Sequence, residues 1–300
     1  MVDVKWNTTK QDGNSSAKIF DQFESDMASS RESGDVHGDM QIGDADKSLE
    51  AADRIIERKY KVPYLAHACM EPMNAVAHYN DGACDLWTGT QNPLGFKHEV
   101  AKALEIEPAN VNVTNYFMGG GFGRRATPDA AIQAAQISKA VGLPVKLIWS
   151  REEDVQHDHY RPAVASNFRA ALGKNGLPVA WENQFVDKHE PAEATHIPYA
   201  IANQNIFYTD SPTHVPFGAW RSVDHSQHGF FVESFIDELA VEAGQDPYQY
   251  RRKLLGQEPR LLNVLERVAK ESNWETPIGK NRGRGIALQE SFGSIVAEVV

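Results

Sequence analysis

The residues from Met118 to Arg125, MGGGFGRR, combine features of an anion-binding loop. Four of the five residues from Gly119 to Gly123 are glycines, which tolerate positive φ angles and let backbone N–H groups approach a ligand. Arg124 and Arg125 follow at once, and a guanidinium group can form paired, charge-assisted hydrogen bonds to phosphate-like oxygens. A helix N-terminus directly after such a loop adds to its attraction for an anion. The segment predicts contact with a large anionic ligand; the alternative is a tight turn that needs glycine only for close packing.

Two common phosphate motifs do not match this loop. The dinucleotide fingerprint G-x-G-x-x-G, counted from Gly119, needs glycine or alanine where Arg124 stands. The P-loop pattern G-x-x-x-x-G-K-[ST] finds no match in the loop. An ordinary dinucleotide or ATP site is therefore poorly supported. An unrelated α/β enzyme with a nucleotide phosphate on the loop stays open as an alternative.

The other polar clusters are less specific. The segments 157–159 (HDH) and 225–228 (HSQH) resemble metal-ligand spacings, but neither has a third ligand at a defensible spacing, so we interpret these histidines as surface or hydrogen-bonded residues. The acidic run 152–154 is more typical of a solvated turn after a strand. Cys69 and Cys84 form no C-x-x-C pattern, which argues against an iron–sulfur cluster or a structural zinc and favours two small buried residues.

Composition limits the kinds of partner. The chain has 300 residues, enough for one large domain or two ordinary ones, and 30 basic residues against 41 acidic residues give a net charge of -11. Such a chain offers no general basic surface for nucleic acid or an anionic membrane, so an anion site has to be a local pocket. No apolar run in this chain is long enough to span a bilayer, and the first residues show no signal-peptide pattern.

The elements that would position the loop alternate between strand and helix, which is typical of an α/β layer. A hairpin over 75–89 turns at Asn80-Asp81-Gly82, and a helix over 92–108 opens with the cap Asn92 and Pro93. A strand over 111–117, a helix over 128–141 capped by Thr127 and a strand over 143–152 complete the predicted layer.

The remaining segments predict additional strands and packed helices. A strand is expected over 1–6, and 7–47 reads as exposed loop except for a short helix over 17–28. Antiparallel strands are expected within 161–188, around a turn at Lys174-Asn175-Gly176. We also expect a helical start that becomes extended over 48–67, helices over 226–244 and 246–255, a final strand-like run, and core positions at Phe230, Phe231, Phe235, Ile236 and Leu239. The predicted fold class is α/β, with mixed sheets and packed helices.

Six ordered motifs resemble one protein family. They are VPYLAHACMEPMNAVAHY (62–79), LWTGTQNP (86–93), MGGGFGRR (118–125), SREEDVQHDHYRPA (150–163), GAWRSVDHSQHGFFVESFIDELA (218–240) and GRGIALQESFGSIVAEV (283–299). Together they resemble the large molybdopterin-binding subunit of the xanthine dehydrogenase and aldehyde oxidase family, in the branch of isoquinoline 1-oxidoreductase β subunits and membrane-associated bacterial aldehyde dehydrogenases. The resemblance implies an N-terminal extension over 1–59 and the front part of a molybdopterin-binding domain over 60–300.

The resemblance also implies roles for particular residues. Gln91 matches a glutamine whose amide reaches an oxygen ligand of molybdenum, and Gly123 after Phe122 matches a glycine whose amide faces the oxo group. Arg221 matches loosely an arginine beside the metal centre, as only it and the preceding aromatic residue agree. Cofactor contacts are thus expected at Gln91, Gly120, Gly121, Phe122, Gly123, Arg124, Arg125 and Arg221, with Gln91 and Arg221 also catalytic and Glu71 and Trp220 on the substrate side.

The function implied is hydroxylation of an aldehyde or N-heteroaromatic substrate with water. The cofactor would be molybdopterin, or its cytosine dinucleotide form, and electrons would pass to a separate small 2Fe–2S subunit, while a cytochrome c subunit would be a further partner. Arg124-Arg125-Ala126 stand where purine-oxidising relatives carry Gly-Gly-Lys and a glutamate, which argues against purines. No G-E-P motif supplies the family's late glutamate base, so we expect the front part of a larger subunit, inactive by itself. The alternative is a cofactor-free binding or assembly protein on the same fold.

Overall fold

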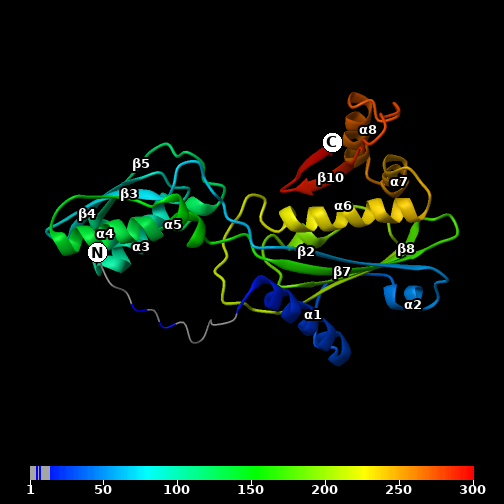
Figure 1. The fold of residues 1–300 in the computed structure, drawn as a ribbon, viewed down its shortest axis with the longest axis horizontal. Coiled ribbons are helices and arrows are strands. Elements are labelled where there is room, and N and C mark those ends of the chain that lie inside the picture. The colour runs from blue at the N-terminus through cyan, green and yellow to red at the C-terminus, as the bar shows by residue number, and fades with distance from the viewer. Residues whose placement is uncertain (1–4, 6, 8–13) are drawn as a thin grey trace. The chain divides into compact units, whose positions relative to one another are not determined.

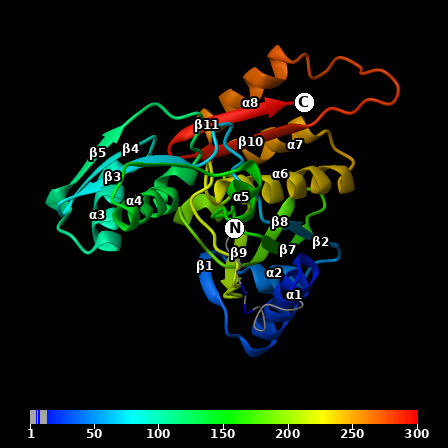
Figure 2. The ribbon, with the colours of Figure 1, turned by 60° about the vertical axis from the view of Figure 1, so that its left-hand side comes forward.

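The computed structural model describes Lys5, Asn7 and residues 14–300. Contacts divide the chain into two compact units (Figures 1 and 2). Unit 2 comprises Tyr64–Ala163 and His214–Val223, whereas unit 1 comprises the chain up to Pro63, Val164–Thr213 and Asp224–Val300. The strand expected over 1–6 lies, apart from Lys5, outside the described residues.

Unit 2 is built on a four-stranded sheet in the order β5-β4-β3-β6. Its strands are β3 (Asn74–Asn80), β4 (Ala83–Thr88), β5 (Val111–Asn115) and β6 (Val145–Ile148). Two helices, α3 (Pro93–Leu104) and α4 (Asp129–Val141), cover one face of this sheet (Figure 1). The shared core is rich in alanine on both sides, with Ala75 and Ala77 on β3 against Ala131, Ala134 and Ala135 on α4, so the helix can approach the strand closely.

Several local predictions for unit 2 are confirmed. The hairpin pairs Asn80 with Ala83 around the predicted turn, and Asn92 caps α3 by accepting a hydrogen bond from the Gly95 N–H. The cap at Thr127 is wrong, because Thr127 ends the 3-10 turn Arg124–Ala126 and α4 begins without a side-chain cap. The strand expected over 143–152 stops at Ile148, since Ser150 caps a further helix, α5 (Arg151–Gln156).

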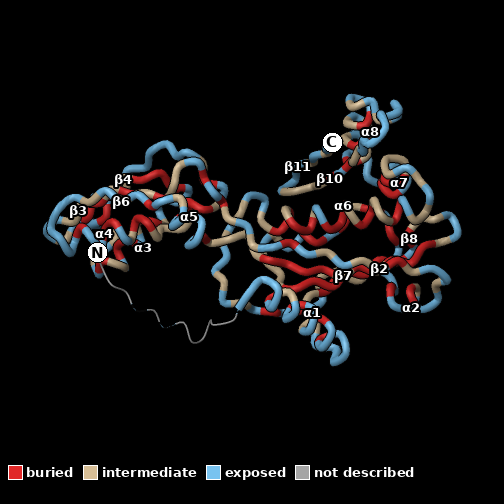
Figure 3. The backbone as a smooth tube through the Cα atoms, in the orientation of Figure 1, coloured by how far each residue is buried: buried red, intermediate tan, exposed pale blue. Residues whose placement is uncertain are grey.

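Unit 1 contains a five-stranded sheet in the order β1-β9-β8-β7-β2. Its strands are β1 (His37–Ile42), β2 (Ile55–Val62), β7 (Val164–Leu172), β8 (Pro178–Val186) and β9 (Asn203–Thr209). Helix α6 (His225–Glu242) covers one face, and α1 (Ser16–Ser33) and α2 (Ala45–Glu50) lie on the other (Figure 1). Because both faces are covered, β7 and β8 are buried along nearly their whole length rather than at alternate residues (Figure 3).

The remaining elements of unit 1 follow α6. They are α7 (Pro247–Leu254), α8 (Pro259–Glu271) and a two-stranded hairpin of β10 (Ile286–Ser291) and β11 (Ser294–Val299). Two further 3-10 turns lie at Pro108–Asn110 in unit 2 and Ala192–Thr195 in unit 1. Asp246 caps α7 with Pro247 at its first turn, as predicted. Among the described residues, no helix combines the length and apolar character that crossing a membrane requires.

The N-terminal region is more ordered than its composition predicts. The helix expected over 17–28 is confirmed and extends over Ser16–Ser33. The loop expected elsewhere in 7–47 is wrong where β1 and the start of α2 lie. Strand β1 has no alternating apolar pattern because it is an edge strand that pairs with β9, far along the chain. The predicted core positions of α6 are buried except Phe230, which is 52% exposed.

Candidate functional site

Three distant segments of unit 2 meet at the glycine loop. The Gln91 side-chain carbonyl accepts a hydrogen bond from the Gly123 N–H at 2.9 Å. A Cβ built on Gly121 would lie 2.5 Å from Gln91 Oε1, and one built on Gly123 would overlap the carbonyl oxygen of Ala219. The loop therefore touches both Gln91 and the segment that carries Trp220 and Arg221.

Close packing inside the protein accounts for the glycines of the loop. A Cβ on Gly119 would lie 2.6 Å from the Cβ of Glu71, and one on Gly120 would lie 2.8 Å from the ring of Phe122. Gly120 and Gly123 also have positive φ angles of 99° and 106°, which side-chain-bearing residues rarely adopt. The tight-turn alternative thus explains the glycine content by itself, and only the hydrogen-bond donors that remain unused indicate a ligand contact.

The two arginines after the loop are buried, with exposed fractions of 1% for Arg124 and 2% for Arg125. Arg124 donates to both carboxylate oxygens of Asp129, at 3.2 and 2.6 Å, and its Nε lies 3.0 Å from Asp158. Arg125 donates to the carbonyl oxygens of Gly120 and Glu71, both at 2.8 Å. The sequence-based expectation had these guanidinium groups facing a phosphate, whereas the structure turns them inward to hold the loop.

Glu71 supports the loop from the opposite side. Its carboxylate accepts hydrogen bonds from the Gly119 N–H and from Asn74 Nδ2, and lies 3.3 Å from Arg125. Partial burial raises the pKa of Glu71, but these donors lower it by a larger amount. The pKa of Glu71 therefore lies below its ordinary value. An ionised carboxylate with these partners positions the loop rather than acting as a proton donor.

Sequence reasoning missed a buried pair beside the loop, His67 and Asp158. Asp158 is 1% exposed and lies between two histidines that the sequence drew attention to. Those flanking residues are peripheral: His157 is exposed and near Glu153, and the ring of His159 lies 3.9 Å from Asp129. The available signal was an acidic residue between two histidines within a matched motif, but only the fold shows that the acid is the buried member.

Several donors around the loop have no hydrogen-bond partner within the described part of the chain. They are Nε2 of Gln91, the backbone N–H groups of Gly120, Gly121 and Phe122, the exposed guanidinium of Arg221, and the buried Nε1 of Trp220. All of them can only donate, so as a set they match a ligand rich in anionic oxygens. The chemistry of this donor set fits a phosphate-bearing or oxygen-ligated cofactor.

The apolar side chains next to this donor set are unusually exposed. Phe117 is fully exposed, Met70 is 88% exposed, and Tyr116 and Phe122 are 60% and 46% exposed. Phe122 also has a positive φ of 55°, a conformation that disfavours a bulky residue. The loop thus presents its aromatic ring outward while its backbone is fixed from within.

The two cysteines and the histidines of the segment 225–228 do not contribute to this donor set. Cys69 and Cys84 are buried free cysteines, as expected. On α6, His225 Nδ1 contacts Gln289. The ring of His228 is buried and has no hydrogen-bond partner among the described residues, so the surface or hydrogen-bonded interpretation is wrong for His228. Within the residues that the structure describes, no three His, Cys, Asp or Glu side chains are grouped so as to hold a metal ion.

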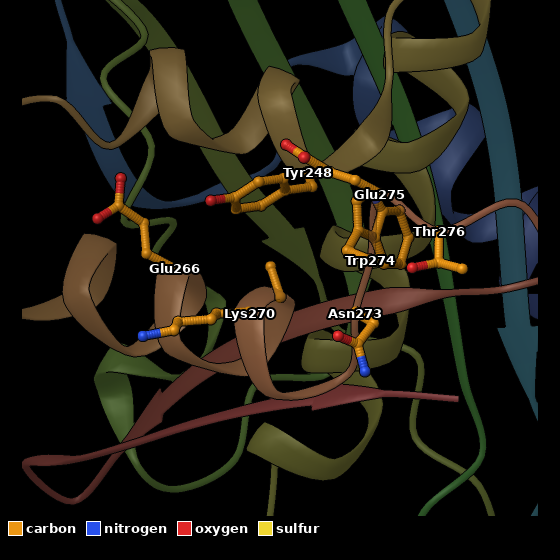
Figure 4. A pocket seen from close by; sticks show the side chains of 8 residues that line it. Tyr248, Glu266, Lys270, Asn273, Trp274, Glu275 and Thr276 are labelled. Atoms are coloured by element: carbon orange, nitrogen blue, oxygen red, sulfur yellow. The ribbon is translucent and has the colours of Figure 1, made fainter.

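A separate pocket of about 370 Å³ lies on unit 1, between α7, α8 and the segment that follows (Figure 4). The ring of Tyr248 lies between Glu266 and Trp274, with Lys270 below it. Glu266 is already bound by Arg252 at 2.8 Å. None of the residues predicted for the site lines this pocket, so it does not belong to the donor set around the loop.

Comparison with known proteins decides the family. The pattern that defines the molybdopterin cofactor-binding domain matches residues 28–255, which is more than half of the chain. This chain belongs to the molybdopterin cofactor-binding domain family. The glycine loop, Gln91 and Arg221 all lie inside the matched region of this molybdopterin domain.

Relatives of this molybdopterin domain are bacterial oxidoreductases. It is 28% identical to the β subunit of an isoquinoline 1-oxidoreductase of Brevundimonas diminuta, over 96% of this chain and 40% of that protein. It is 29% identical to a membrane-bound aldehyde dehydrogenase of Gluconacetobacter polyoxogenes, over 81% of this chain and 36% of that protein. An aldehyde oxidoreductase of Desulfovibrio gigas shares the fold with a TM-score of 0.68 at 24% identity, over 84% of this chain and 31% of that chain.

The molybdopterin domain described here corresponds to a minor part of these proteins. It spans at most 40% of the length of the relatives named above. Several relatives are named as subunits. They include the isoquinoline protein and a nicotinate dehydrogenase protein of Pseudomonas putida that is 28% identical over 78% of this chain and 21% of its own length. The fold class predicted from sequence is confirmed by this family match and by the solved structure.

Proposed function

We propose that this chain forms part of the cofactor site of a molybdenum hydroxylase. Such an enzyme would insert oxygen from water into a C–H bond of an aldehyde or N-heteroaromatic substrate. The observation that carries the proposal is the set of unused donors at one loop, drawn from Gln91, the 120–122 backbone and Arg221. Family membership supplies the cofactor class, and the donor set indicates which residues of this chain would hold it.

In this proposal the residues of the chain bind and orient. The Gln91 side chain is fixed because its carbonyl oxygen accepts a hydrogen bond from the Gly123 N–H. The Nε2 of Gln91 is then left to donate to a cofactor oxygen. The backbone N–H groups of 120–122 and the Arg221 guanidinium would add further donors, and Arg124, Arg125 and Glu71 would keep the loop in place from inside. When bound, the molybdenum centre would supply the two-electron chemistry of hydroxylation. Trp220, whose indole N–H has no partner among the residues that the structure describes, would line the substrate side.

The substrate class and partners are inferred from the relatives. Their names include isoquinoline, nicotinate and aldehyde as substrates, which supports an aldehyde or an N-heteroaromatic ring here. Electrons would pass to a separate small 2Fe–2S subunit, since the two buried cysteines of this chain cannot supply the four ligands of such a cluster. A cytochrome c subunit is proposed as a further acceptor, and the cytosine dinucleotide form of the pterin as the form bound.

A cofactor-free binding or assembly protein on the same fold is the second candidate. The observation that favours it is that Gly123 donates its N–H to Gln91 and that packing alone explains the glycines. In that case the donors around the loop would serve a protein partner or solvent. Molybdenum analysis separates the two candidates directly.

The test is metal content in a host that makes the molybdenum cofactor. Copurification of molybdenum near one atom per chain supports the proposal, and its absence favours the second candidate. Arg221→Ala is expected to lower the molybdenum content, whereas Arg267→Ala, which removes an exposed arginine on α8, should leave it unchanged. Equal molybdenum in both variants would contradict the assignment of Arg221.

A further inference from the structure

His67 connects a buried carboxylate to the segment that carries Arg221. Its ring Nδ1 lies 3.0 and 3.1 Å from the two carboxylate oxygens of Asp158, and its Nε2 lies 3.0 Å from the carbonyl oxygen of Ala219. The side chains of His67 and Asp158 are each 1% exposed. Both ring nitrogens therefore face an oxygen, and the contact between His67 and Asp158 is buried.

Asp158 acts only as an acceptor in this arrangement. Besides the His67 ring, it receives the backbone N–H groups of His67 at 2.6 Å and His159 at 2.7 Å, and Arg124 Nε lies 3.0 Å away. Burial raises the pKa of Asp158, but the hydrogen bonds from the His67 ring and backbone, with the charge of Arg124, lower it below its ordinary value. An ionised carboxylate cannot donate, so Nδ1 of His67 has to carry a proton.

The second ring nitrogen faces a carbonyl oxygen, which also cannot donate. We infer that His67 is an imidazolium ion that positions the Ala219–Arg221 segment by donating one hydrogen bond to Asp158 and one to the Ala219 carbonyl. The local charges agree, because the cations His67 and Arg124 are matched by the anions Asp158 and Asp129. A neutral ring would leave one nitrogen lone pair facing an oxygen lone pair, which is unfavourable.

Two residues determine where the Ala219 carbonyl lies. His67 contacts its oxygen, and Gly123 has no Cβ that would occupy the same space. The next residue, Trp220, places its ring 6.4 Å from the His67 ring and under the guanidinium of Arg161 at 5.9 Å. His67 is therefore a positioning residue for Trp220 and Arg221, and its effect on a cofactor rests on the function proposed above.

The protonation state can be read directly by NMR of the 300-residue chain with isotope-labelled histidine rings. His67→Gln identifies the His67 signals by their loss. We expect both ring nitrogens of His67 to carry protons. An unprotonated ring nitrogen on His67 would overturn the inference. Because this measurement uses the unmodified chain, it stands even if a variant folds poorly.

Limited proteolysis tests the positioning role. Glutamine carries both of its N–H donors on one nitrogen, so it cannot replace the bonds of two separate ring nitrogens. Cleavage by trypsin after the exposed Arg221 should therefore become about tenfold faster in His67→Gln. Cleavage after Lys174, in an exposed turn of unit 1, serves as the internal reference and should not change. His98→Gln, an exposed histidine on α3, is the matched control. Unchanged cleavage after Arg221, or equal acceleration at Lys174, would contradict the inference.

The outcome is separable from that of the proposed function. If the unmodified chain holds no molybdenum, the hydroxylase proposal fails while the NMR and proteolysis results still decide the role of His67. If it does hold molybdenum, His67→Gln is expected to retain less than His98→Gln. Equal retention in these two variants would overturn the link between His67 and the cofactor.

Discussion

The side-chain carbonyl of Gln91 and the backbone N–H of Gly123 form a 2.9 Å hydrogen bond across 32 residues of sequence. The bond uses the acceptor of the amide and leaves both Nε2 protons available. It also fixes the direction in which those protons point, because an amide is planar. One residue thus anchors the loop and offers a donor beside it, and the two roles can be separated by mutation.

Gln91→Glu keeps an acceptor for the Gly123 N–H but removes the free donor and adds a negative charge. We expect the free energy of unfolding to change by less than about 1 kcal/mol, since Gln91 is exposed. Molybdenum content should fall at least about tenfold, the effect of losing a charge-assisted donor. The control is Gln136→Glu, at an exposed position on α4. Retention of the metal in Gln91→Glu would remove Gln91 from the site.

Gly123→Ala should destabilise the chain independently of any ligand. The new Cβ would overlap the Ala219 carbonyl and adopt a φ of 106°, so we expect a loss of about 2–4 kcal/mol in the free energy of unfolding by urea titration. Gly142→Ala is the matched control, because Gly142 also has a positive φ, 66°, but open space around it. It should cost only about 1 kcal/mol. Equal losses of unfolding free energy in the two variants would show that the Ala219 segment moves away from the new Cβ without strain.

Arg124→Ala should be among the most damaging single changes in unit 2. Removing the buried guanidinium leaves Asp129 with one fewer partner and Asp158 with His67 as its only cation. Breaking a buried ion pair by deleting one partner costs about 3–5 kcal/mol. Thermal unfolding should show a large decrease in Tm, and Arg267→Ala should show none. A small effect would indicate that Arg124 is more hydrated than its 1% exposure implies.

His228 makes stability depend on pH. Burial lowers its pKa from 6.5 to about 4, so between these values the unfolded chain binds a proton that the folded chain does not. The stabilisation is complete above about pH 6.5 and is lost as the pH falls toward 4, by about 3 kcal/mol in total. His228→Leu should flatten that part of the stability curve in urea titrations at successive pH values, and His98→Gln should not. An unchanged slope in His228→Leu would refute this assignment.

Residues that are close together in sequence encode the local elements, and the ordered motifs indicate the family. The turn at Asn80-Asp81-Gly82, the Asn92 cap and the Asp246 cap were predictable because each is encoded by neighbouring residues whose side chains or φ preferences act within one turn. The six ordered motifs likewise placed the chain in a family that the domain match confirms. Gln91, the loop and Arg221 lie within those motifs, although only the fold brings Gln91 and the Ala219–Arg221 segment to the loop.

Which polar groups are free and which are structural depends on the packing of distant segments. Arg124, Arg125 and Glu71 have the chemistry of a ligand site in sequence, yet their partners are Asp129, Asp158 and the loop itself. His67 and β1 were overlooked for the same physical reason. A buried hydrogen bond or an edge-strand pairing depends on residues far along the chain, and spacing within a motif carries no information about which distant group fills the space beside it.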